Sequence, residues 1–208
     1  MVETICNTLT NKIRKKMPEI DDERAEVINY GLQLVMGEIP KTFIILLFAY
    51  MLGVFKLTLL SMLFILPYRT VSGGTHLRTH IGCVVATTIF YSGNALISKY
   101  IVFTNAYIKY GLIILVWLFS MIMIKMYAPA DTVDVPILRK KDRKRKEILS
   151  YVIMTISLIA GALARNNVIS NLLIFGTLLQ SIVITRFMYN ITKNKYGYEE
   201  YLKGNLKV

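Results

Sequence analysis

Long apolar runs, separated by short polar or basic segments, recur along this chain. Six of them stand out, at residues 43–55, 57–68, 81–97, 107–127, 148–163 and 168–188. A helix needs roughly 20 apolar residues to cross a bilayer core, and fewer when flanking Lys and Arg side chains reach back to the interface. The pattern therefore predicts an all-α polytopic membrane protein with about six transmembrane helices, built as one domain over residues 1–208.

The first two runs are short and meet at Lys56. The first can be extended backwards through "VINYGLQLVMGEIP", with Pro40 as a kink. A single bent span over residues 43–68 is the alternative, and it would place the basic N-terminus on the opposite side from the other basic clusters. The last two runs form a hairpin that turns at residues 165–167.

An amphipathic helix is predicted ahead of the spans. Apolar side chains recur every fourth residue opposite four basic side chains at positions 12–16, and they are Ile5, Leu9, Ile13 and Met17. Such a helix lies in the membrane interface. Pro18 ends it, and Asp21 or Asp22 caps the helix that follows. Cys6 falls near the apolar face, where we expect a small buried side chain.

Composition and charge agree with a membrane protein. The chain is 54% apolar and 18% charged, against about 45–50% and about 25% in soluble domains. The formal net charge is +12, and seven basic residues fall within residues 139–146, "RKKDRKRK". The positive-inside rule places this cluster, the segment 68–80 and both termini in the cytoplasm of a multi-pass cell-membrane protein. We expect lipid, and no nucleic acid, as its partner.

The segment "SGGTHLRTHIGC" contains both histidines and one of the two cysteines of the chain. If it is helical from His76 onward, His76, His80 and Cys83 share one helical face, which suits a zinc site with an open position. The alternative is a thiol–imidazole pair, in which His76 or His80 takes the proton of Cys83. The start of a helix near position 81 would favour an anionic sulfur.

Two further features belong to the candidate site. Gly73 and Gly74 can adopt backbone conformations closed to other residues, and their N–H groups could bind an oxyanion or allow a substrate backbone to come close. "YAPADTVDVPI" follows the fourth span on the same side and holds Asp131 and Asp134. Either acid could orient an imidazole; otherwise both are solvated or paired with Arg139 or Lys140.

The sequence resembles the accessory gene regulator B (AgrB) family of membrane peptidases. The resemblance rests on "YRTVSGGTHLRTHIGC", with Arg69, the glycine pair, His76 and Cys83, on "APADT", and on the basic segment and the six apolar runs. It covers essentially the whole chain. It implies a membrane-embedded cysteine endopeptidase that cleaves the precursor of a quorum-sensing pheromone and helps to form its cyclic thiolactone.

The same resemblance assigns roles. It makes Cys83 the nucleophile and His76 its base, near the cytoplasmic face, without a metal or cofactor. Arg69, Arg78 and the basic segment are candidate contacts for an acidic precursor peptide, Asp131 is a candidate orienting acid, and a homodimer is expected. The alternatives are a zinc-dependent peptidase that uses His76, His80 and Cys83, and a non-enzymatic peptide exporter. An exporter would carry ionisable residues within its spans, whereas Lys56, Arg165 and Arg186 lie near span ends.

Overall fold

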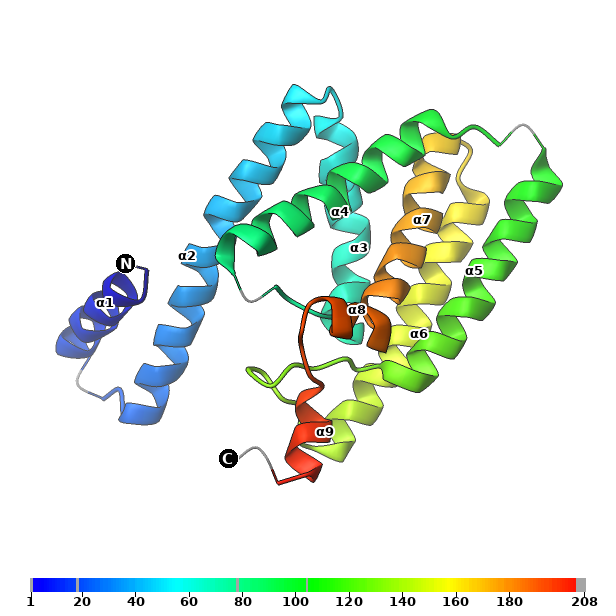
Figure 1. Ribbon diagram of the computed structural model, residues 1–208. Helices are drawn as coiled ribbons and strands as arrows, with labels where there is room; N and C mark the ends of the chain where they lie inside the picture. The colour runs from blue at the N-terminus through cyan, green and yellow to red at the C-terminus, as the bar shows by residue number, and fades with distance from the viewer. Residues whose placement is uncertain (1, 18, 78, 104, 205–208) are drawn as a thin grey trace. The chain divides into compact units, whose positions relative to one another are not determined.

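The computed structural model describes residues 2–17, 19–77, 79–103 and 105–204. Over these residues the chain is all-helical and has no named strand (Figure 1). The helices are α1 (Val2–Lys16), α2 (Asp22–Met51), α3 (Phe55–Ser72), α4 (His80–Tyr100), α5 (Ala106–Tyr127), α6 (Lys140–Leu163), α7 (Asn167–Val183), α8 (Arg186–Ile191) and α9 (Gly197–Leu202). The predicted fold class, all-α, is confirmed.

The chain divides into two compact units, Met1–Phe48 and Ala49–Val208. In the first, α1 packs against α2 through Cys6 Sγ, which lies 3.6 Å from Met36 Sδ. Cys6 is fully buried, as expected. The backbone N–H of Arg24 donates to the Asp21 carboxylate, so Asp21 caps α2. Ile5 and Leu9 stay exposed, which leaves the apolar row of α1 open to a membrane interface.

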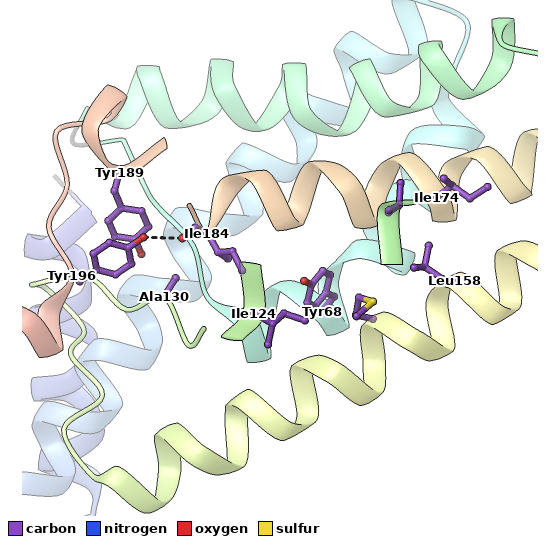
Figure 2. Packing of buried hydrophobic residues seen from close by; sticks show 10 residues of the cluster. Tyr68, Ile124, Ala130, Leu158, Ile174, Ile184, Tyr189 and Tyr196 are labelled. Atoms are coloured by element: carbon purple, nitrogen blue, oxygen red, sulfur yellow. Dashed lines mark hydrogen bonds between the residues drawn. The ribbon is translucent and has the colours of Figure 1, made fainter. Parts of the chain in front are cut away.

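Helix α7 is the centre of the second unit and packs against α3, α4, α5 and α6. The core below it is drawn in Figure 2, where Tyr68, Ile124, Leu158 and Ile174 converge from four different helices. Burial of these side chains removes apolar surface from water or from loosely packed lipid and fixes the helices by close packing.

Four helices of the described chain are long and apolar enough to cross a membrane, namely Asp22–Met51, Ile81–Tyr100, Ala106–Tyr127 and Lys140–Leu163. Helix α7 is apolar but has only 17 residues, and α3 coincides with the second predicted run. The apolar helices indicate a membrane protein. The count of six spans and the orientation of the termini stay predictions, as does the single domain.

Three predicted boundaries are wrong. The run 43–55 ends earlier than predicted, because α2 ends at Met51 and Gly53 turns the chain at φ +67°. Its predicted backward extension through Pro40 is confirmed, since α2 begins at Asp22. The run 168–188 is broken after Val183, before α8 begins at Arg186. The run 148–163 begins too late: residues 140–146, in the basic segment, are the first turns of α6, because Lys and Arg are good helix formers and nothing there interrupts the helix.

Candidate functional site

The segment between α3 and α4 carries the candidate chemistry. Residues 74–77 have no regular structure, and α4 begins only at His80, after Thr79 in an extended conformation. The Thr79 side chain caps α4 by accepting the Gly82 N–H at 3.2 Å. His76 therefore does not share a helical face with Cys83, and the predicted helical zinc geometry is wrong.

Cys83 lies in the first turn of α4. Its N–H donates to the Thr79 carbonyl at 2.9 Å and closes that turn. The Sγ atom lies 4.0 Å from Thr87 Oγ1, and the Thr87 hydroxyl donates to the Cys83 carbonyl. Cys83 is partly exposed, whereas Cys6 has an exposed fraction of 0%. Of the two thiols, Cys83 is thus the one that a substrate or reagent can reach.

The backbone that leads to His76 is held from four directions. The Ser72 carbonyl accepts the Ala130 N–H at 2.8 Å. The Gly73 carbonyl accepts the Gln180 side-chain amide at 2.8 Å. The Thr75 carbonyl accepts the Arg69 guanidinium at 3.3 Å, and the His76 carbonyl accepts the Asn194 side-chain amide. The four donors come from the 128–139 loop, α7, α3 and the segment after α8, so distant parts of the unit fix this loop.

The two glycines let the loop pass close to Ala130. Gly73 has φ +75°, and a Cβ there would lie 2.2 Å from the Ala130 carbonyl oxygen. The Gly73 N–H donates to Arg69 O and the Gly74 N–H to Ala130 O. Both N–H groups are therefore in use in this conformation, and the backbone that approaches the glycines is that of the chain itself. A contact between these glycines and a substrate stays a prediction.

The other predicted site residues fall in different places. The Arg69 guanidinium donates to Gln180 Oε1 at 3.4 Å as well as to Thr75 O, so it braces the loop. Arg78 lies outside the described residues, as does the side chain of His80. His76 is exposed, and its side chain could meet a substrate from solvent or from the interface.

Asp131 anchors the loop between α5 and α6. Its carboxylate accepts the N–H groups of Ile137 at 2.9 Å and Tyr198 at 3.0 Å, and it pairs with Arg143 at 3.1 Å. Its side chain is 0% exposed. These contacts tie the loop to α6 and to α9, as the adjacent green and red segments of Figure 1 show. They are structural contacts, and the orientation of an imidazole by Asp131 stays a prediction.

Asp131→Asn is expected to lower the free energy of unfolding by about 3 kcal/mol, because it leaves the largely buried Arg143 without its counter-charge. Thermal unfolding of the detergent-solubilised protein measures this loss. Asp134→Asn is the matched control, since Asp134 is exposed, and it should change stability by less than about 0.5 kcal/mol. Equal losses in the two variants would contradict the anchoring role.

Two stacked tyrosines join the C-terminal segment to this loop. The rings of Tyr189 and Tyr196 lie 4.0 Å apart and nearly parallel (Figure 2). Burial is the largest cause that raises the pKa of both phenols, and a neighbouring tyrosine raises the pKa of each one further. Both hydroxyls therefore stay protonated and donate, Tyr189 to Asp131 O at 3.1 Å and Tyr196 to Ile184 O at 2.8 Å.

Sequence reasoning missed two side chains that hold the loop. Gln180 is fully buried in α7, and a lone amide inside an apolar run could have indicated it. Asn194 lies in a tail whose lysines suggested only membrane orientation, and no local pattern distinguishes it. Among the side chains that the structure describes, no three His, Cys, Asp or Glu residues gather as a metal site requires.

The fold and this segment define a polytopic helical protein with a reachable thiol at the start of a helix and a histidine on the loop before it. The chain belongs to the accessory gene regulator B family, whose model matches residues 6–184. Membership supports a role in the processing of a quorum-sensing peptide. It is also consistent with the membrane location that the apolar helices indicate.

Relatives align over most of the chain. A putative AgrB-like protein of Clostridium acetobutylicum is 23% identical over 211 residues, which are 98% of this chain and 96% of the relative. One of Listeria innocua is 26% identical over 205 residues, or 96% and 94%. The accessory gene regulator protein B of Staphylococcus epidermidis is 28% identical over 157 residues, or 76% and 77%. No solved structure matches the chain significantly.

Proposed function

We propose that this protein is a cysteine endopeptidase that cleaves a pheromone precursor near its C-terminal side. Cys83 is the nucleophile and His76 the general base. The observation that carries the proposal is the arrangement at the start of α4. An exposed His76 lies on a braced loop, and seven residues later the partly exposed thiol of Cys83 lies in the first helical turn. Cysteine nucleophiles require a base of this kind and access for the substrate.

The chemistry balances without a cofactor. The Cys83 thiol gives its proton to the His76 imidazole, and the sulfur attacks the scissile carbonyl of the precursor. The peptide C–N bond breaks, the C-terminal fragment leaves with the proton, and a thioester with Cys83 remains. A cysteine thiol within the precursor then attacks this thioester, which forms the thiolactone and returns the proton to Cys83. A site at the membrane edge would limit competing hydrolysis by water.

Binding of the precursor involves charge. The first turns of α6 present a run of exposed basic side chains, among them Lys140, Lys141 and Lys144, and these would attract an acidic segment of the precursor. In the sequence, Arg69 and Arg78 flank the glycine pair, and both could contact the same segment. Cytoplasmic termini, an active site near the cytoplasmic face and a homodimer complete the proposal.

Alkylation tests the assignment of the nucleophile. Iodoacetamide should modify Cys83 faster than the buried Cys6, and modification should abolish cleavage of a synthetic precursor peptide. Peptide mapping by mass spectrometry and a cleavage assay of the same sample measure both effects. The Cys6→Ser variant is the control and should lose activity at the same rate as the unmodified sequence. Full cleavage by protein alkylated at Cys83 would overturn the proposal.

A further inference from the structure

The C-terminal segment reaches back to the loop that carries His76. The side-chain amide of Asn194 donates to the main-chain carbonyl of His76 and to the hydroxyl of Thr75. The Thr75 hydroxyl also shares a hydrogen bond with the hydroxyl of Thr192. Thr75 and Thr192 are buried, with exposed fractions of 7% and 9%. Residues 117 to 119 positions apart in the chain thus meet directly beside the candidate base.

The position of the Asn194 contact matters. Arg69 holds the carbonyl of Thr75, which precedes the His76 amide, and Asn194 holds the carbonyl of His76 itself. The two hydrogen bonds bracket the Cα atom from which the imidazole projects. With both flanking peptide units held, the direction of the Cα–Cβ bond is set, and the imidazole keeps only its own rotamer choices. Because the backbone is held, the imidazole samples fewer conformations before it reaches a reactive geometry with Cys83.

Asn194 is itself held in place. Its N–H donates to the Tyr189 carbonyl at 2.9 Å, which closes a tight turn after α8. Lys193, within this turn, has φ +55° and is a non-glycine residue in the left-handed region. Such a conformation costs energy and persists where the surroundings enforce it. The stacked Tyr189 and Tyr196 on either side of the turn supply that support.

We propose that Asn194 is a positioning residue, which fixes the His76 backbone so that the imidazole can take the proton of Cys83. This inference rests on the proposed function and deepens it. It brings into the site a segment, residues 185–204, that lies beyond the residues matched by the family model. In this arrangement the C-terminal segment braces the backbone of the base through Asn194.

A double-mutant cycle tests the proposal without a substrate. In a Cys6→Ser background Cys83 is the single thiol, and its rate of alkylation by iodoacetamide is measured across neutral and alkaline pH. Asn194→Ala should lower the rate at neutral pH by about 10-fold and shift the pH profile toward that of His76→Ala. In a His76→Ala protein, Asn194→Ala should have no further effect. Asn190→Ala is the matched control, since Asn190 is exposed on α8, and should leave the rate unchanged.

Each outcome has one meaning. If Asn194→Ala slows alkylation equally with and without His76, the amide acts only on the fold, and the inference is overturned. If His76→Ala slows alkylation and Asn194→Ala does not, the inference fails while the thiol–imidazole pair stands. If His76→Ala itself leaves the rate and its pH profile unchanged, the pair fails and the proposed function fails with it. Circular dichroism of every variant verifies that the helices are retained.

Discussion

Cys83→Ala is expected to reduce cleavage of the co-expressed precursor by about 1000-fold or more, to below detection, because it removes the nucleophile and with it the covalent step. His76→Ala should cost about 100- to 10,000-fold, the range of a lost general base. Mass spectrometry of cells that express each variant together with its precursor gene measures the cleaved and cyclised products. The effect is chemical, so both variants should still reach the membrane in normal amounts.

His80→Ala is the internal control. His80 is the first residue of α4, three positions before Cys83, and the proposed mechanism gives it no role. Retained cleavage in His80→Ala separates it from His76. If His80→Ala is equally inactive and a chelator also stops cleavage, a zinc-dependent peptidase is the better explanation. If Cys83→Ala still cleaves the precursor, the nucleophile has been assigned wrongly, and if no variant affects the product, a non-enzymatic exporter regains support.

Gly73→Ala is expected to lower the free energy of unfolding by about 3 kcal/mol or more, and to abolish cleavage with it. The added Cβ would lie 2.2 Å from the Ala130 carbonyl oxygen, a backbone atom that cannot move aside cheaply. The φ of +75° adds strain for any residue with a side chain. Thermal unfolding in detergent and the co-expression assay measure the two losses.

Gly93→Ala is the matched control for this substitution. Gly93 lies within α4, and a Cβ there would meet nothing within 4 Å. The change should be neutral or stabilise the protein by up to about 1 kcal/mol, since alanine favours the helix. A Gly73→Ala protein as stable and active as Gly93→Ala would show that the approach of the loop to Ala130 is not needed.

Local pattern was a good guide to the helices. The hairpin predicted at residues 165–167 is present, with α6 ending at Leu163 and Asn166 capping α7 through the N–H groups of Val168 and Ile169. Such features depend on neighbouring residues alone, namely apolar periodicity and a capping side chain. The extension of α2 through Pro40 also follows the predicted pattern. The errors lie at helix ends, as in the basic segment, which is helical although no apolar run marks it.

The sequence by itself determined the all-helical membrane character, most helix positions, and a short segment that holds both histidines and one cysteine. Only the tertiary structure decided how that segment is held. Two of the four donors that fix it, Gln180 and Asn194, lie 107 and 118 positions from the carbonyls they bind. Such contacts depend on how α3, α7 and the C-terminal segment pack together. No periodicity predicts them, because a hydrogen bond between distant residues does not constrain the residue types next to either partner in the sequence.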